Sequence, residues 1–231
     1  VPLQFWFCKN PGCALPLIAL QYHEVKLNIT FNSLNKLHRY SSATKTNKIK
    51  EASLYVDYIY LDTDERRRFA QVSHEYLIEQ LQFTGEETAK EKHTLNFNHP
   101  VKELVWVSRL DTSTTAPSTA IDASQNEWFN FTDVAASSGT DSQVTGDGKN
   151  PTVDAKLQLN GHDRFSKREG SYFNWVQPYQ HHTGSPSVGV NVYSFGLTPE
   201  EHQPSGTCNF SRIDNAKLNC TTATGANINI Y

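Results

Sequence analysis

The sequence of 231 residues contains no methionine, only four cysteines, and no apolar run of about the eighteen residues that a membrane-spanning helix needs. A membrane span is therefore excluded. No basic-then-apolar signal segment stands before Pro2. Because a complete reading frame starts with methionine, we expect this chain to be a fragment or a processed piece of a longer protein.

Positive charge is scarce and scattered. The formal net charge is −3, the sequence pI is near 6.3, and the only basic cluster is the arginine triplet at residues 66–68. That triplet directly follows an acidic run at residues 62–65, which favours a solvated or ion-paired helix face over a phosphate site. A nucleic-acid-binding surface needs a basic patch, so no direct nucleic-acid partner is predicted.

The cysteines also argue against a metal site. Cys8, Cys13, Cys208 and Cys220 are unevenly spaced, with no C-x-x-C pair and no histidines at zinc-finger spacing. So few cysteines in this length favour buried free thiols in a reducing compartment, although Cys8 with Cys13, or Cys208 with Cys220, could close a disulfide.

Alternation of polar and apolar residues predicts an all-β chain. Residues 23–31 place Val25, Leu27, Ile29 and Phe31 on one inward face, and Trp106 is expected to anchor the core. Residues 14–22 read as a core element buried on both faces. Helices are expected only at residues 66–72, after a capping Asp62, and as one turn at residues 198–201. The predicted strands cover residues 4–8, 52–61, 73–84, 101–110, 154–164, 172–178, 189–197, 217–222 and 227–231, besides 23–31.

Residues 111–153 differ from the rest in composition. Ser, Thr, Ala, Asp, Gly and Asn dominate there, apart from an aromatic cluster at residues 128–131. So polar a stretch cannot bury enough apolar surface to fold alone. We expect a long, exposed surface loop whose aromatic residues clamp its base.

Catalytic and ligand-binding patterns are weak. The sequence at residues 146–149 lacks the Ser or Thr of a phosphate-binding loop, and His181–His182 has no carboxylate at the spacing of a metal site. The acidic pairs at residues 62 and 64 and at 200 and 201 have helix-capping roles. No catalytic, cofactor-binding or metal residue is therefore predicted. One alternative stays open: a carbohydrate-binding or glycan-hydrolysing protein whose groove is lined by Glu24, Glu75, Glu79 and Glu103 on strands.

Four Asn-x-Ser/Thr sequons occur, at Asn28, Asn130, Asn209 and Asn219. Only Asn130 lies in the predicted exposed loop, and it is the one candidate glycosylation site.

Several blocks carry a family resemblance. PEEHQPSGTCNFSRIDNA at residues 199–216 resembles the C-terminal jelly roll of the major capsid protein of nucleocytoplasmic large DNA viruses, the group of the phycodnaviruses and iridoviruses. Further blocks resemble the family in the same order: VPLQFWFCKNPGCALPLIALQYHEVKL (1–27), YVDYIYLDTDERRRFAQVSHEYLIEQLQ (55–82), HPVKELVWV (99–107) and YFNWVQPYQHHTGSP (172–186).

The resemblance implies an eight-stranded jelly-roll sandwich over residues 1–231, the second roll of a double jelly roll, with the N-terminal roll and the last strand absent. It implies a non-enzymatic subunit that forms homotrimers, and these pseudo-hexameric capsomers tile the outer shell of an icosahedral double-stranded DNA virus. Implied partners are neighbouring capsomers, minor capsid and membrane proteins of the virion, and surface glycans, with assembly in the host cytoplasm and no cofactor.

Overall fold

The computed structural model describes residues 1–33, 48–88, 90–111, 127–134, 148–223 and 225–231. The chain divides into two compact units. Of the described residues, unit 1 contains 1–33 and 48–81, and unit 2 contains those from 82 to 231.

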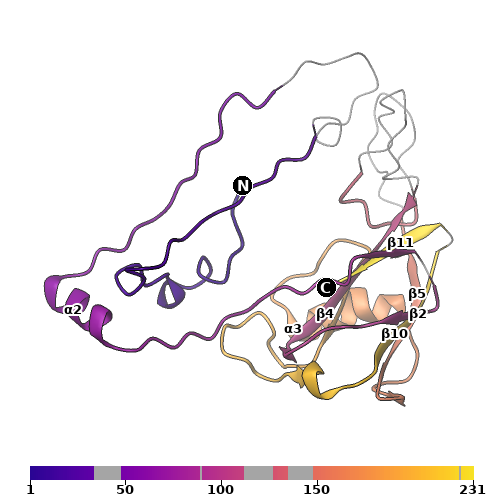
Figure 1. Ribbon diagram of the computed structural model, residues 1–231. Coiled ribbons are helices and arrows are strands. Elements are labelled where there is room, and N and C mark those ends of the chain that lie inside the picture. The colour runs from indigo at the N-terminus through magenta and orange to yellow at the C-terminus, as the bar shows by residue number, and fades with distance from the viewer. Residues whose placement is uncertain (34–47, 89, 112–126, 135–147, 224) are drawn as a thin grey trace. The chain divides into compact units, whose positions relative to one another are not determined.

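Unit 2 is built from antiparallel strands in two main sheets (Figure 1). The first sheet has the order β1 (Glu86–Thr88), β11 (Ala226–Ile230), β4 (Glu103–Leu110) and β8 (Val190–Ser194). The second has the order β2 (Lys92–Thr94), β10 (Ala216–Thr222), β5 (Thr152–Leu159) and β6 (His162–Asp163), and β7 (Arg168–Glu169) also pairs with β5. A separate short pair joins β3 (Pro100–Val101) to β9 (Cys208–Asn209).

The two main sheets enclose one hydrophobic core. Leu104, Trp106 and Ile228 from the first sheet and Leu157 and Leu218 from the second belong to the same buried cluster, each at most 1% exposed. Alternation along the strands therefore directs one face of each sheet inward, as in a β-sandwich. The prediction that Trp106 anchors the core is confirmed.

Local sequence accounts for the best-formed hairpin. Asn160 (φ 51°) and Gly161 (φ 83°) occupy the two central positions of the turn between β5 and β6, where both residues need positive φ. The strands predicted at residues 217–222 and 227–231 are confirmed, and the one at 189–197 is confirmed but shortened to β8. The range 101–110 is interrupted between β3 and β4, and the strand predicted at 154–164 ends at Leu159 and turns back as β6.

Two predictions of local structure in unit 2 are wrong. Residues 172–178 form a π-helical turn, η4 (Tyr172–Val176), and the start of α3 (Gln177–His181), where a strand was predicted. Residues 198–201 form only a hydrogen-bonded turn, with Glu201 N 3.3 Å from Thr198 O. The Glu200 carboxylate accepts a hydrogen bond from the Thr183 amide instead of capping a helix. A short 3₁₀ turn, η5 (Phe210–Arg212), follows β9.

Unit 1 contains a 3₁₀ turn, η1 (Pro11–Cys13), and the helix α2 (Thr63–Gln71). The predicted helix is confirmed and begins earlier than expected, with the Asp62 carboxylate accepting from Glu65 N at 2.8 Å. The described residues of unit 1 include no strand, so the strands predicted at 4–8, 23–31 and 52–61 are wrong. The strand at 73–84 and the buried element at 14–22 are also wrong.

The apolar residues of these segments are exposed instead of buried. Val25, Ile29 and Phe31 are each more than half exposed, and so is Leu54. A β-strand needs a neighbouring strand for its backbone amides, and the described part of unit 1 supplies none. Aromatic contacts hold the unit together instead: Trp6 lies 5.9 Å from Tyr76, whose hydroxyl donates to Ala14 O.

The strand count also differs from the prediction. The described residues contain eleven strands, whereas alternation predicted ten and the family resemblance implied eight. Four of the eleven strands have only two residues. The predicted loop at 111–153 lies mostly outside the described residues, and its described ends join β4 to β5. No described helix is long and apolar enough to cross a membrane.

Candidate functional site

The two adjacent histidines of the sequence take separate roles. His181 Nδ1 lies 2.9 Å from the backbone oxygen of Leu197, whereas His182 Nε2 lies 2.7 Å from Glu103 Oε2 on β4. Within the described ranges, no group of three or more His, Cys, Asp and Glu side chains could hold a metal ion.

The carboxylates considered for a sugar-binding groove do not lie together on strands. Glu24, Glu75 and Glu79 belong to unit 1 and lie outside any strand, so that part of the alternative is wrong. Glu103 lies on β4, where it is paired with His182. Glycoside hydrolysis needs two carboxyl groups held across a cleft, and these four residues supply no such pair on one sheet.

A second histidine–carboxylate pair joins the two main sheets of unit 2. Glu87 on β1 places Oε2 2.7 Å from Nδ1 of His93 on β2 and 3.0 Å from Lys90 Nζ. Burial acts to raise the pKa of Glu87, but hydrogen bonds from His93 and Lys90 outweigh it and lower the pKa below its ordinary value. Because the His93 ring is fully buried, the pair acts as a cross-link within the fold.

The thiols of unit 2 are poor nucleophiles. Burial raises the pKa of Cys220 to about 12 and also raises that of Cys208. The thiolate is the reactive form of cysteine, so both side chains stay protonated and unreactive near neutral pH. The thiols of Cys8, Cys208 and Cys220 are free.

The candidate glycosylation residue lies in a tight polar turn. Asn130 is 9% exposed, and its Nδ2 donates to Glu127 Oε2 at 2.8 Å and to Val134 O at 2.9 Å. An N-linked sugar replaces one hydrogen of this nitrogen, so attachment requires one of the two hydrogen bonds to break. Glycosylation at Asn130 stays a prediction.

The described base of the 111–153 segment is fixed to the sandwich. The Arg109 guanidinium lies 5.5 Å from the centre of the Trp128 ring, a cation–π contact. A Cβ added to Gly189 (φ +91°) would lie 1.8 Å from the carbonyl oxygen of Phe131, so only glycine permits this approach. Phe129, in contrast, is 90% exposed.

A buried amide cluster supports the same region. Asn191 on β8 is fully buried, and its Oδ1 accepts a hydrogen bond from Asn150 Nδ2 at 2.6 Å. Its Nδ2 lies 3.2 Å from the hydroxyl oxygen of Thr152 at the start of β5. These hydrogen bonds connect the edge strand of the first sheet to the second sheet. They also give the buried Asn191 side chain the hydrogen-bond partners that a polar group needs inside a core.

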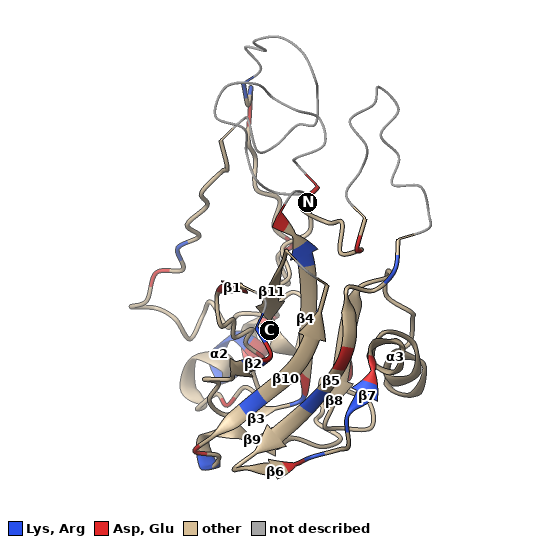
Figure 2. Ribbon diagram, turned by 90° about the vertical axis from the view of Figure 1, so that its right-hand side faces the viewer, with Lys and Arg blue, Asp and Glu red and all other residues tan. Residues whose placement is uncertain are grey.

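The edge of the first sheet at β8 is covered by η4 and α3. Asn174 Nδ2 donates to Val190 O at 2.8 Å, and Gln177 Oε1 accepts from Ser194 N at 3.0 Å. Two side-chain amides thereby bond to the backbone at both ends of β8, in place of a further strand. An uncovered edge strand is a template for pairing with another chain, and this helical segment blocks it. Figure 2 shows α3 at the side of the sandwich, with no Lys, Arg, Asp or Glu along it.

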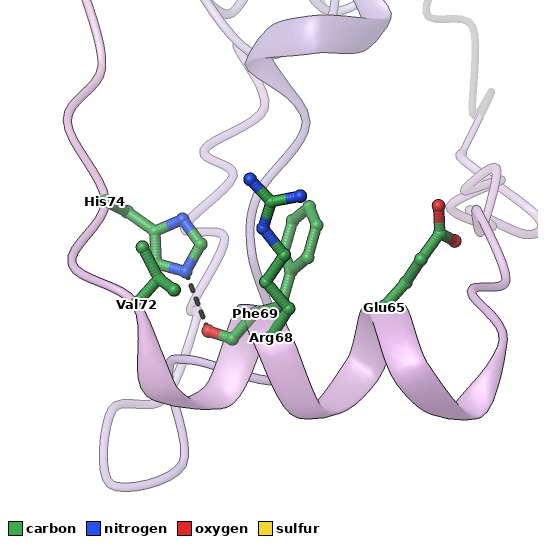
Figure 3. Close-up of a pocket in the computed structure, with 5 residues that line it drawn as sticks. All are labelled: Glu65, Arg68, Phe69, Val72 and His74. Atoms are coloured by element: carbon green, nitrogen blue, oxygen red, sulfur yellow. Dashed lines mark hydrogen bonds between the residues drawn. The ribbon is translucent and has the colours of Figure 1, made fainter.

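Unit 1 has a pocket of its own (Figure 3). It has a volume of about 260 Å³ and is lined by Glu65, Arg68, Phe69, Val72 and His74. His74 Nε2 lies 2.8 Å from the backbone oxygen of Phe69, so the ring is engaged by the end of α2. The ionisable residues of the lining are Glu65, Arg68 and His74, and the His74 ring is already hydrogen-bonded to the backbone. These three side chains do not form a recognisable catalytic arrangement.

Comparisons with known proteins all point to one group. The family model described as large eukaryotic DNA virus major capsid protein matches residues 65–231, and that described as major capsid protein N-terminus matches residues 1–62. The major capsid protein of Pyramimonas orientalis virus is 52% identical over 95% of this chain and 52% of its own length. That of Paramecium bursaria Chlorella virus 1 is 50% identical over 97% of this chain and 54% of its own length.

A solved structure of the PBCV-1 virus capsid matches 100% of this chain and 65% of its own chain, with a TM-score of 0.66 at 36% identity. This likeness confirms the predicted jelly-roll fold. The chain spans about half the length of the curated relatives it matches.

Proposed function

Since this chain belongs to the major capsid proteins of large eukaryotic DNA viruses, we propose that it is part of a structural subunit that associates with copies of itself to form the outer shell of a virion. The observation that carries this proposal is the likeness to a viral capsid chain along the whole of this sequence. In this function the surfaces of the sandwich act by contact, and no side chain takes part in turnover.

The subunit is proposed to form trimers, each a pseudo-hexagonal capsomer that contacts neighbouring capsomers. A trimer of subunits with two jelly rolls each presents six similar lobes, which suits tiling of a flat shell. Minor capsid proteins, membrane proteins of the virion and surface glycans are further proposed partners, and the host cytoplasm is the proposed place of assembly.

We also propose that the C-terminal roll is formed by residues 82–231 alone, which is narrower than the range 1–231 predicted from the sequence. Unit 1 is then part of the N-terminal roll of a longer subunit. Two observations support this: residues 1–62 match the N-terminal family model, and the strand-patterned segments of unit 1 are exposed and unpaired. Their partners would be strands from the part of the relatives that this chain does not span.

Sedimentation velocity tests the proposed self-association. We expect the full-length subunit that contains these 231 residues to form trimers or larger species as its concentration rises, with no hydrolysis of any polysaccharide. A full-length subunit that stays monomeric at every concentration, or that turns over a sugar polymer with saturation, contradicts the proposal.

Hydrogen exchange tests the assignment of unit 1. Amides at residues 23–31 and 52–61 should exchange within seconds, whereas those of β4, β5, β10 and β11 should be protected. A shorter chain of residues 82–231 should keep the melting temperature of the sandwich. Protection of residues 23–31 in the 231-residue chain would show that these strands find their partners without a longer protein.

A further inference from the structure

The outer face of the helical segment beside β8 carries large exposed side chains. Trp175 of η4 is 66% exposed, Tyr179 of α3 is 85% exposed, and Leu197, whose backbone oxygen is bonded to His181, is 71% exposed. We propose that these three residues, named the aromatic face, form the centre of a surface on which a second copy of this chain docks. The inference rests on the proposed self-associating function and assigns the place of contact.

The aromatic face is held rigidly from beneath. Phe173 is fully buried and its ring centre lies 5.0 Å from that of Trp106. The bonds of Asn174 and Gln177 to β8 fix the rest of the segment. At the far end, the Glu200 carboxylate bonds the Thr183 amide, which ties the loop of Leu197 to the end of α3. A surface already ordered before contact loses little conformational entropy on binding.

Charge favours a second copy as the occupant. Residues 170–199 contain no Asp, Glu, Lys or Arg, in a chain of which 19% of residues are charged. Two copies with a net charge of −3 repel each other elsewhere, whereas contact through this neutral segment requires no charge to be desolvated. The centres of protein interfaces are depleted of charged residues and rich in Trp and Tyr.

The area of the aromatic face suits the centre of an interface. A fully buried aromatic side chain removes about 150–250 Å² from water, so the three residues at their observed exposure offer on the order of 400 Å². A stable interface buries about 800 Å² on each partner, so the face supplies roughly half of it and polar residues around it supply the rim. Because Asn174 and Gln177 already close the β8 edge, the second copy docks by side-chain packing and not by strand addition.

The test compares the double variant Trp175→Ser/Tyr179→Ser with the control Phe129→Ser, which removes an equally exposed aromatic ring of unit 2 outside the face. Sedimentation velocity of the full-length subunit that contains these 231 residues gives the dissociation constant of self-association. We expect the double variant to raise it by roughly 700-fold and the control to change it less than about threefold, since Trp and Tyr at interface centres are each worth about 2 kcal/mol and every 1.4 kcal/mol is a factor of ten.

The outcomes separate this inference from the proposed function. If the unsubstituted chain does not associate at all, the proposed function fails and this inference fails with it. If it associates and the double variant associates equally well, only the aromatic face is refuted. Equal weakening by the control also refutes it.

A photo-crosslinking residue at position 179 keeps the test decisive if the double variant does not fold. Irradiation of the associated sample should yield a covalent dimer in which position 179 of one copy is linked to a second copy. Crosslinking absent from an associated sample overturns the inference.

Discussion

Replacing Gln177 by methionine removes the side-chain groups that close the β8 edge while the side-chain volume stays nearly the same. The buried amide of Ser194 loses its acceptor at 3.0 Å, and the hydroxyl of Tyr172 loses its donor at 2.9 Å. An unsatisfied buried donor costs about 1–3 kcal/mol and an ordinary hydrogen bond contributes about 0.5–1.5 kcal/mol. We therefore expect Gln177→Met to lower the free energy of unfolding by about 2–4 kcal/mol.

A loss of this size is large against the total stability of about 5–15 kcal/mol of a typical domain. It corresponds to a decrease in melting temperature on the order of 10 °C. Urea denaturation at neutral pH measures it directly, and an unchanged slope of the free energy against urea shows that the unfolded states are comparable.

The matched control is Gln180→Met, which makes the same chemical change three residues further along the same helix at an exposed position. We expect it to change the free energy of unfolding by less than about 0.5 kcal/mol. If the two variants lose the same stability, Gln177 does not close the edge and the reasoning is refuted. Faster aggregation of Gln177→Met than of Gln180→Met, followed by light scattering, would support the protective role of this side chain.

Three further predictions concern the sandwich. Trp106→Ala should cost about 3–5 kcal/mol because it leaves a cavity in the core, whereas Trp106→Phe should cost much less because an aromatic ring still fills most of that space and no hydrogen bond of the indole N–H is lost among the described residues; equal losses by urea denaturation would contradict this. Gly189→Ala should destabilise far more than Gly161→Ala, because both have positive φ but only a Cβ at Gly189 meets a backbone oxygen, and thermal unfolding of the two variants decides it. The lowered pKa of Glu87 means that its pairing with His93 stabilises the fold fully above about pH 4.5, and that this contribution is lost as the pH falls through the lower folded pKa. Glu87→Gln should therefore be less stable than the unsubstituted chain at pH 7, and a difference that does not shrink as the pH falls below 4.5 towards acid unfolding would refute the assignment.

Local sequence predicted those strands whose partners lie in the same chain. The alternation at β4, β5, β10 and β11 was sufficient because each of these strands pairs with others of unit 2. Residues 23–31 alternate just as clearly and form no strand. Alternation of polar and apolar residues indicates which face of a strand would be buried. The strand forms only when a neighbouring strand makes hydrogen bonds to its backbone, and the alternation pattern does not show whether such a neighbour is present.

The helix beside β8 was missed for a different reason. Phe173, Asn174, Gln177 and Pro178 are buried, a spacing typical of one helical face. Two of the four are polar amides, so a pattern based on hydrophobicity alone did not reveal it. Their burial is explained only by the edge strand that they bond, which lies several residues further along the chain.

The aromatic face could be inferred in part from the sequence, since the uncharged run at residues 170–199 is visible there. That Trp175 and Tyr179 point to solvent while Phe173 points to the core needs the structure. The same holds for the burial of Asn130, which its polar surroundings in the sequence did not indicate.

The closed edge at β8 bears on how a shell of such subunits corrects mistakes during growth. Contacts made by extended backbone ladders release slowly, as the persistence of amyloid illustrates. On the proposed function, a subunit that contacts its neighbours there only through side chains forms no such ladder, so it can leave a wrong position and rebind in the right one. By withholding one backbone edge from its neighbours, the Asn174 and Gln177 amides favour a lattice that anneals into regular order over one that sets irreversibly around its first defects.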